Sequence, residues 1–201
     1  MSKYRGPRLR IVRRFGELPR FTRKRPNRST RPGQHGENRR KLTQFATRLT
    51  EKQKLRFHYG VSEKQIIRYV KDARRVKGST RKALVRNLEI RLDNTVYRIG
   101  WGITVPRSRQ IVSHGNILVN QACVNIPCFP CAPNQTVKIQ AFEKIHEIVK
   151  KNLQEYSRIP PSHIYMSSGS LTAVVKQWAN LNDSELDTSE LLIIEYYSNR
   201  L

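Results

Sequence analysis

Residues 106–120 read PRSRQIVSHGNILVN, and this stretch contains the signals for a short helix followed directly by a β-strand. Pro106 suits the first turn of a helix, because its missing N–H group needs no partner there. Gly115 suits the position just after the last turn, where glycine ends many helices. The apolar run ILVN (117–120) then predicts a short strand. The sequence therefore predicts a short helix joined directly to a small sheet.

Two further strands are predicted after this one. CVNIP (123–127) predicts a strand that pairs with 117–120 around a turn at Asn120-Gln121, and TVKI (136–139) predicts another. Together these segments predict a small antiparallel hairpin sheet.

The predicted helix 106–114 has a polar side formed by Arg107, Gln110 and His114, at spacings of three and four residues. Arg109 falls on a different side, where it would flank a groove. A basic helix on a small sheet makes a rigid, compact surface that suits a phosphate backbone.

The chain is strongly basic. It has 201 residues, with 39 Lys and Arg against 15 Asp and Glu, and a net charge of +24. Such a surplus repels itself in a free protein, so it indicates a polyanionic partner, with nucleic acid first and an anionic membrane well behind. No apolar run approaches the ~20 residues that span a bilayer. Because 30 of the 39 basic residues lie in the first 100, this half should supply most of the anion-binding surface.

Residues 1–45 are predicted to form a basic N-terminal arm. Between Thr22 and Lys41, glycine, proline and arginine dominate, so this stretch has too little apolar surface to offset the entropy that ordering costs. We expect the arm to become ordered on its partner, and the stretch 22–41 to be a solvated linker in the free protein.

Two helices are predicted after the arm. Thr50 with Gln53, and Ser62 with Gln65, have the spacing of a capping box. Gly60, which lies between them, is a natural helix stop.

The second of these helices has two unlike faces. Its apolar face consists of Ile66, Ile67, Val70 and Ala73. Its basic face consists of Lys64, Arg68, Lys71 and Arg75. Asp72 is the one acidic residue at helical spacing from this stripe, so the pattern favours phosphate contact over a merely solvated face.

A single third helix is predicted from Ser79 or Thr80 to Ile99, and Gly100 would end it. Its core positions recur every three or four residues: Leu84, Leu88, Leu92, Val96 and Ile99. Trp101 is interpreted as a packing residue.

Two more elements are predicted in the last third of the chain. Residues 142–156 predict an amphipathic helix. The run 191–197 fits a helix end or a buried strand equally well.

The sequence has no enzyme signature: neither a phosphate-binding or dinucleotide glycine pattern nor a Gly-x-Ser-x-Gly nucleophile motif. We predict no catalytic site, no cofactor and no small-molecule substrate. The three cysteines, Cys123, Cys128 and Cys131, are odd in number, which argues against a disulfide framework and for a reducing compartment. Zinc usually takes four ligands, so we predict no metal site.

RNA is favoured over DNA as the partner. Residues 81–99 and 106–114 could form a helix-turn-helix, but the second helix is short and most of the charge lies elsewhere. A wide basic surface suits RNA, which proteins read by shape through phosphates and 2′-hydroxyl groups. Four aromatic residues lie among basic ones and would either stack on unpaired bases or pack in the core: Tyr4, Phe57, Tyr59 and Tyr69.

Several segments resemble a known family. The RNA-binding module named after the fourth protein of the small ribosomal subunit is similar to RLDNTVYRIG (91–100), PRSRQIVSHGNILVN (106–120) and VNIP (124–127). This module also occurs in some tRNA synthetases, pseudouridine synthases and a heat-shock protein. The flanking segments resemble the family of that ribosomal protein itself. They are YRGPRLRIVRR (4–14), EKQKLRFHYGVSEKQ (51–65) and LLIIEYYS (191–198). The resemblance covers nearly the whole chain.

The resemblance implies an α+β fold. A mainly helical domain would contain an inserted small α/β RNA-binding module, with two helices and an antiparallel hairpin sheet. The implied parts are the basic arm (1–45), the first part of the helical domain (46–87), the inserted module (88–175) and the C-terminal part of the helical domain (176–201).

The resemblance also implies a function. The protein would be a structural constituent of the ribosome that binds the 5′ domain of small-subunit ribosomal RNA, nucleates assembly of the subunit body and contributes to translational accuracy. It would lie near the region where messenger RNA enters, next to the fifth small-subunit protein.

Nineteen residues are expected to contact RNA, from the resemblance and from the basic pattern together. They are Tyr4, Arg5, Arg8, Arg10, Arg13, Arg14, Lys52, Lys54, Arg56, Tyr59, Gly60, Lys64, Arg68, Lys71, Arg107, Arg109, Gln110, His114 and Asn120.

Two other classes of protein compete with this hypothesis. A pseudouridine synthase that carries the module would need a separate catalytic domain, and the roughly 50 residues after the module are too few for one. A free-standing RNA chaperone of the heat-shock type would not need the first 85 residues or the EYYS tail.

The cellular location is also suggested by resemblance. MSKYRGPRLRIVRRFGELP (1–19), RFHYG (56–60) and EYYSNR (195–200) resemble plastid versions of the protein. With no room for a transit peptide before this start, we expect an organelle-encoded protein of the plastid (chloroplast) ribosome. A bacterial cytoplasmic ribosome, notably a cyanobacterial one, is the alternative, and mitochondria come third.

Overall fold

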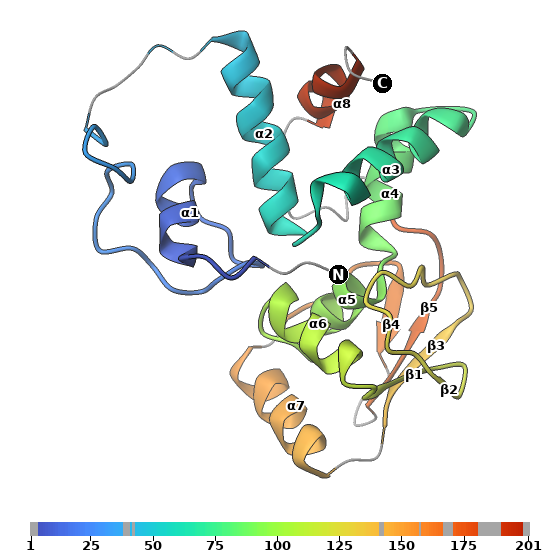
Figure 1. Cartoon of the computed structure of the whole chain (residues 1–201). Helices are drawn as coiled ribbons and strands as arrows, with labels where there is room; N and C mark the ends of the chain where they lie inside the picture. Colours follow the sequence, from blue (N-terminus) through green and yellow to red (C-terminus); the bar gives the residue numbers. More distant parts are fainter. Residues whose placement is uncertain are drawn as a thin grey trace. The chain divides into compact units, whose positions relative to one another are not determined.

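The computed structural model describes residues 4–37, 41, 43–140, 143–156, 158–166, 171–180 and 190–198. The chain forms two compact units (Figure 1). One comprises Met1–Arg81 together with Leu186–Leu201, and the other, inserted between these two parts, is Lys82–Glu185. The predicted module boundaries at 88 and 175 lie six and ten residues inside these limits. Helices and an antiparallel sheet are both present, so the predicted α+β class is confirmed.

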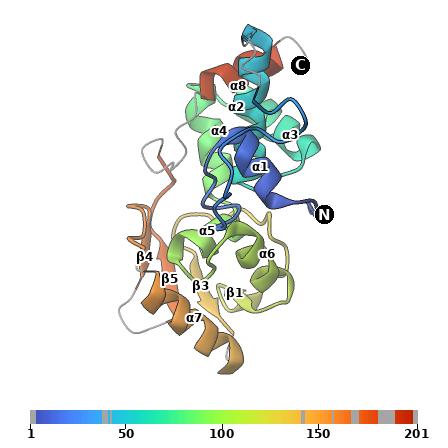
Figure 2. The ribbon, with the colours of Figure 1, turned by 90° about the vertical axis from the view of Figure 1, so that its left-hand side faces the viewer.

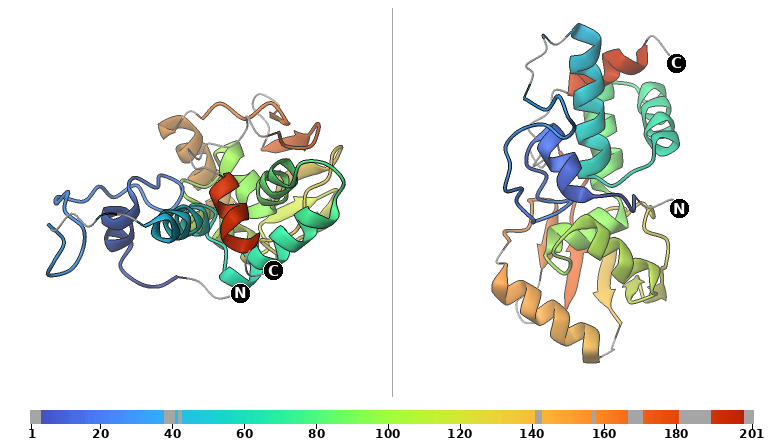
Figure 3. Two further views of the ribbon diagram at one scale, coloured as in Figure 1. Left: turned by 90° about the horizontal axis from the view of Figure 1, so that it is seen from above. Right: turned by 60° about the vertical axis from the view of Figure 1, so that its left-hand side comes forward.

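The first unit is helical in its described part. It contains α1 (Arg8–Phe15), α2 (Gln44–His58), α3 (Glu63–Arg75) and α8 (Glu190–Ser198). Helix α8 lies against α2, as both panels of Figure 3 show, and it also contacts α3. The run 191–197, which fitted either a helix or a strand, is therefore a helix.

The predicted start of α2 at Thr50 is wrong. The N-cap is Thr43, whose side chain accepts a hydrogen bond from the Ala46 N–H at 3.2 Å. Thr50 lies inside the helix, where its hydroxyl donates to the carbonyl of Ala46, one turn earlier, at 2.7 Å. Thr50 and Gln53 therefore have the spacing of a capping box, but Thr50 is not the N-cap of α2.

The turn between α2 and α3 agrees with the predicted stop at Gly60. Gly60 has φ of +61°, a left-handed conformation that glycine adopts without strain, and the N–H of Val61 donates back to the carbonyl of Arg56. Helix α3 then begins after Ser62, as predicted, but the Ser62 side chain makes no capping hydrogen bond. Gln65 instead donates to the Tyr69 hydroxyl at 3.1 Å.

Part of the N-terminal arm is folded onto this unit. Leu18 and Phe21 are buried and pack with Phe57 of α2 in a small apolar cluster. Within the described range 22–37 there is neither helix nor strand, as expected of that stretch. The expectation of an arm ordered only by its partner is therefore wrong for residues 8–21.

The inserted unit begins within α4 (Thr80–Glu89), which is followed by α5 (Leu92–Ile99). The single helix predicted from 79 to 99 is thus two helices. The chain between them is extended, because the Ile90 carbonyl accepts from the N–H of Cys131 at 2.7 Å and the N–H of Leu92 donates to the Phe129 carbonyl at 2.8 Å. The core positions predicted along this stretch, from Leu84 to Ile99, are confirmed as fully buried.

The remaining helices of this unit are α6 (Val105–Ser113) and α7 (Glu143–Glu155), and both match predicted helices. In α6, Pro106 lies in the first turn and Gly115, with φ of +76°, follows the end.

Over the residues that the structure describes, the sheet has five strands, all antiparallel, in the order β2-β1-β3-β5-β4. Their bounds are β1 (Ile117–Val119), β2 (Ala122–Cys123), β3 (Thr136–Ile139), β4 (Ile164–Met166) and β5 (Thr172–Val175). The β1–β2 hairpin turns at Asn120 and Gln121, which have φ of +47° and +73°, as a two-residue hairpin turn of this hand requires. The second strand is shorter than the predicted 123–127.

Helices α5, α6 and α7 cover one face of this sheet (Figure 2). Leu92 and Val96 of α5, Val112 of α6 and Val149 of α7 pack with the inward side chains of the strands in one apolar core. Trp101 is fully buried in the same core, so its interpretation as a packing residue is confirmed. The core fixes the position of α6, whose polar side was predicted to bind RNA.

Candidate nucleic-acid interface

Helix α3 carries a continuous exposed basic stripe. Lys64, Arg68 and Lys71 are exposed, while Ile66 and Val70 on the opposite side are fully buried. The stripe and the apolar face therefore lie as the helical period predicted. Three cations project from one rigid face, which is the arrangement that a phosphate backbone neutralises.

The C-terminal end of the stripe is weakly paired. Arg75 lies 3.9 Å from Asp72, one turn before it, and the two side chains are 81% and 48% exposed. An exposed pair at this distance contributes little to stability, so it would not compete strongly with a phosphate for the arginine.

Lys52 is interior rather than exposed. Its ammonium group lies 2.9 Å and 3.0 Å from the two carboxylate oxygens of Glu63, with only 5% of its side chain accessible. It also lies over the ring of Tyr196, 4.9 Å from the centroid. Lys52 was predicted to face RNA; in this structure it is buried, and its charge joins α2, α3 and α8.

Glu63 is the centre of this junction. Besides Lys52, it accepts a hydrogen bond from the Tyr197 hydroxyl of α8 at 2.7 Å. Burial acts to raise the pKa of Glu63, but the hydrogen bonds from Tyr197 and Lys52 and the charges of Lys52 and Arg56 outweigh it. The pKa of this carboxyl therefore lies below its ordinary value of 4.5.

The other predicted residues at the end of α2 are divided between surface and core. Lys54 and Arg56 are half-buried; Lys54 pairs with Glu51 at 2.8 Å, and the Arg56 guanidinium lies over the ring of Phe57. Tyr59 is buried, and the guanidinium of Arg20 lies 5.1 Å from its ring centroid. Tyr59, which was predicted to face RNA, thus packs inside the unit in this structure.

The arginines of the arm differ in their surroundings. Arg5, Arg8, Arg10 and Arg14 are exposed. Tyr4 is 41% exposed and packs edge-on against Phe57, with ring centroids 5.3 Å apart. Part of the Tyr4 ring is therefore already in contact with the protein itself.

Arg13 has a local structural role. Its guanidinium donates to the Thr30 carbonyl at 2.9 Å, to the Thr30 hydroxyl at 3.3 Å and to the Arg31 carbonyl at 3.1 Å. These bonds hold the loop that contains Thr30 and Arg31 against α1.

In the inserted unit, α6 presents a small polar surface. Arg107 donates to the side-chain oxygen of Gln110 at 2.9 Å, and both residues are half-buried. His114 is exposed at the C-terminal end of the helix. These three lie on the polar side that the spacing predicted.

Arg109 does not lie on that surface. It is 6% exposed, and its guanidinium binds Asp93 of α5, which itself is fully buried and also paired with Arg91 at 2.7 Å. Arg109 was predicted to flank an RNA groove; in this structure it is buried, and its ion pair with Asp93 joins α6 to α5.

Asn120 is exposed and partly engaged in the sheet. Its side-chain oxygen accepts from the Thr136 N–H at 2.8 Å, and its own N–H donates to the Thr136 carbonyl at 2.9 Å. Its side-chain oxygen therefore serves the hairpin.

The sequence did not lead us to predict a second buried charged group in the inserted unit, besides Asp93 and its arginines. Glu89, fully buried, accepts from Arg98 at 3.0 Å and from the Asn94 amide at 2.7 Å. The available signal was the alternation of opposite charges in EIRLDN (89–94) within an apolar helical pattern, because charges at core positions are usually paired.

Over the ranges that the structure describes, no three His, Cys, Asp or Glu side chains come together as metal ligands. In those same ranges no helix is long and apolar enough to cross a membrane. Cys131 is buried, and burial raises the pKa of its thiol to about 12, with the nearby Asp93 charge acting in the same direction and a hydrogen bond with Thr95 opposing them.

Two protein-family models match consecutive parts of the chain. Residues 3–89 match the ribosomal protein S4/S9 N-terminal domain, and residues 90–137 match the S4 domain. The fold and the matched domains define a ribosomal protein of the RNA-binding S4-domain class.

Curated relatives match over the full length. The small ribosomal subunit protein uS4 of Thermosynechococcus vestitus is 49% identical over 207 residues, and that of Trichodesmium erythraeum is 50% identical over 202 residues. The same protein of a Synechocystis strain is 48% identical, and in all three cases the alignment covers the whole of both chains. The chain belongs to the uS4 family of small ribosomal subunit proteins. It is a structural ribosomal protein, not an enzyme.

Proposed function

We propose that this protein binds the 5′ domain of small-subunit ribosomal RNA early in assembly and nucleates the subunit body. The observation that carries the proposal is the division of α3 into a buried apolar side and an exposed side with Lys64, Arg68 and Lys71. A rigid row of cations on one helix face fits a folded RNA site better than scattered charge does, because it can follow one phosphate backbone.

The proposed contact surface omits the residues that the fold has taken inside. Its members are Tyr4, Arg5, Arg8, Arg10, Arg13, Arg14, Lys54, Arg56, Gly60, Lys64, Arg68, Lys71, Arg107, Gln110, His114 and Asn120. Lys52, Tyr59 and Arg109 hold elements in place instead. Because these residues belong to two units, the surface on each unit is proposed separately.

The experiment is a binding comparison with the full chain. The affinity for the 5′ domain of small-subunit ribosomal RNA is measured against an unrelated structured RNA of equal length over a salt series. A preference of about a hundredfold at physiological salt supports one organised site. Equal affinities with equal salt slopes would show nonspecific charge only and would favour an RNA chaperone.

We further propose that the protein lies beside the fifth small-subunit protein, near the region where messenger RNA enters, and that it contributes to translational accuracy. Family membership supports this proposal. Chemical cross-linking of intact small subunits, followed by mass spectrometry, tests the neighbour. Misreading rates in ribosomes that carry surface variants test the effect on accuracy.

We propose a plastid ribosome as the location, with a bacterial cytoplasmic ribosome as the alternative. The relatives named above come from cyanobacteria, whose ribosomal proteins plastid ones resemble. Mass spectrometry of ribosomes from isolated plastids of the source organism decides the matter: finding this chain there supports the proposal, and finding it only in ribosomes of a bacterial cell contradicts it.

A further inference from the structure

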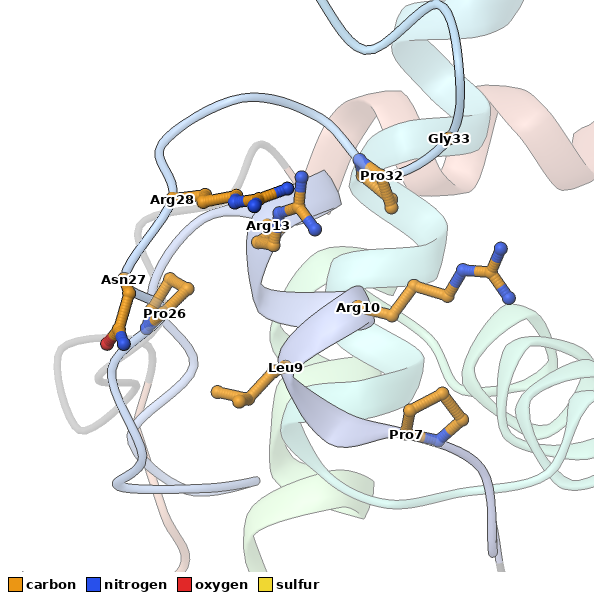
Figure 4. Close-up of a pocket in the computed structure, with 9 residues that line it drawn as sticks. All are labelled: Pro7, Leu9, Arg10, Arg13, Pro26, Asn27, Arg28, Pro32 and Gly33. Carbon is orange, nitrogen blue, oxygen red and sulfur yellow. The ribbon is translucent and has the colours of Figure 1, made fainter.

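A hollow of about 510 Å³ lies between α1 and the loop that doubles back against it, both within the first unit (Figure 4). Its lining combines three arginines, Arg10, Arg13 and Arg28, with apolar surface from Leu9 and several prolines. The described residues that line it include no acidic side chain.

The charges at this hollow are not balanced within the described protein. The side chains of Arg10 and Arg28 form no hydrogen bond or ion pair with any residue that the structure describes. Arg13 donates only to neutral oxygens, the Thr30 carbonyl and hydroxyl and the Arg31 carbonyl. Its positive charge is therefore fixed in position and left without an anion.

The arginine side chains are arranged for one shared ligand. In Figure 4, the Arg28 side chain extends toward the guanidinium group of Arg13, whereas Arg10 extends away from both. Two guanidinium groups that converge without an anion repel each other, and a planar guanidinium fork matches the geometry of a phosphate. The two guanidinium groups, with no anion among the described residues, therefore suit a phosphate ligand.

The rest of the hollow indicates what the phosphate belongs to. Leu9 is 38% exposed although it lies on the same helix as the buried Val12, and it lines the hollow together with Pro7, Pro26 and Pro32. Apolar walls next to a phosphate site would shield a sugar and base from water. A cavity of this volume also falls in the range that encloses a small organic group, about 300–1,000 Å³.

We propose that this hollow binds one unpaired nucleotide of the ribosomal RNA, with its phosphate between Arg13 and Arg28 and its base or sugar against Leu9 and the prolines. Sequence-specific contact with RNA mostly uses unpaired nucleotides whose bases are free to leave the stack. The inference rests on the proposed binding of ribosomal RNA and adds to it a specific site in the arm.

The first test compares two substitutions that remove the same charge from the same loop. Arg28→Ala removes a lining arginine, whereas Arg31→Ala removes an exposed arginine that does not line the hollow and whose backbone carbonyl still accepts from Arg13. We expect Arg28→Ala to lower the affinity of the full chain for the 5′-domain RNA about tenfold. It should also make the salt dependence shallower by roughly one phosphate contact, while Arg31→Ala changes the affinity less than twofold.

The second test fills the hollow without changing charge. Leu9→Trp should lower the affinity for RNA but leave the slope against salt as in the wild type, because no phosphate contact is lost. Circular dichroism checks that each variant is folded. If Leu9→Trp does not fold, Arg28→Ala still tests the inference. A photo-crosslinking residue at Asn27, which also lines the hollow, should attach to a single unpaired nucleotide.

The outcomes separate this inference from the broader proposal. If Arg28→Ala and Arg31→Ala weaken binding equally, or if Asn27 cross-links to paired RNA only, the nucleotide site is overturned while the preference for ribosomal RNA stands. If the wild type itself shows no preference for ribosomal RNA, both proposals are overturned.

Discussion

Arg109 of α6 binds Asp93 of α5 through two nitrogens, with Nη2 at 2.7 Å and Nε at 3.1 Å from one carboxylate oxygen. Asp93 is fully buried and also binds Arg91, so a single acidic residue holds two arginines in the interior of the inserted unit. Removal of the carboxylate would take this ion pair from both buried cations.

Asp93→Ala should therefore destabilise the protein strongly. Breaking a buried pair by removing one partner costs about 3–5 kcal/mol, and urea unfolding followed by circular dichroism measures the change. Arg107→Ala, in the same helix but half-buried with an uncharged partner, should cost under about 1 kcal/mol. Comparable losses in the two variants would show that the Asp93 pair is not a structural centre.

Acid should weaken the junction of α2, α3 and α8. Since the pKa of Glu63 is lower in the folded protein than its ordinary value of 4.5, the unfolded chain binds more protons at this site as the pH falls. The stabilising contribution is complete above about pH 4.5 and is lost as the pH falls through the folded pKa. Unfolding curves of the wild type and Glu63→Gln should differ at neutral pH and approach each other in acid.

Tyr197→Phe provides the matched control for that titration. It removes one of the hydrogen bonds that lower the Glu63 pKa but keeps the carboxylate and the Lys52 pair. The acid loss should therefore begin near the same pH as in the wild type, but it should be smaller in total and complete at a higher pH, because the folded pKa lies closer to the ordinary value. An unchanged acid profile in both variants would contradict the role given to Glu63.

The cysteines should differ sharply in reactivity. Cys131 is buried and its pKa is raised to about 12, so at about pH 8 it is a protonated thiol with no access to reagents. Cys123 is exposed. A coloured thiol reagent should label Cys123 quickly, and Cys123→Ser should abolish this fast phase. Cys131 should react only when the protein unfolds, and rapid labelling of Cys131 in the native state would contradict its burial.

The exposed stripe of α3 should control the salt dependence of RNA binding. The triple variant Lys64→Ala/Arg68→Ala/Lys71→Ala should reduce the slope of log affinity against log salt by about two, since each phosphate contact contributes roughly 0.7–0.9. The control Lys138→Ala/Lys150→Ala/Lys151→Ala removes equal charge from exposed positions outside the proposed surface. It should leave the slope nearly unchanged, and equal effects of both variants would contradict a site on α3.

Local signals predicted much of this structure. Pro106, Gly115 and the apolar run after them predicted α6 and β1, because each of these signals acts within a few residues along the chain. The apolar face of α3 was predicted equally well from its period. The stripe opposite it follows from the same period, and its exposure needed no further information.

Contacts between distant segments were not predictable in this way. The break between α4 and α5 arises because the backbone near Ile90 pairs with residues around Cys131. No residue at the break itself is a typical helix-ending residue such as glycine or proline. Lys52 and Arg109 looked like surface cations because their sequence neighbourhood is basic. Their partners, Glu63 and Asp93, lie on other helices, and only the folded structure brings each pair together.

The division of the chain also sets an order in which it can fold during synthesis. Helix α8 supplies Tyr197 to the junction with Glu63, yet it is translated after the whole of the inserted unit, Lys82–Glu185. The nascent protein can therefore complete the sheet and its covering helices while α2 and α3 still lack one of their packing partners. The helical unit that carries the proposed RNA-binding surface of α3 therefore completes its packing last, although the residues of that surface leave the translating ribosome early.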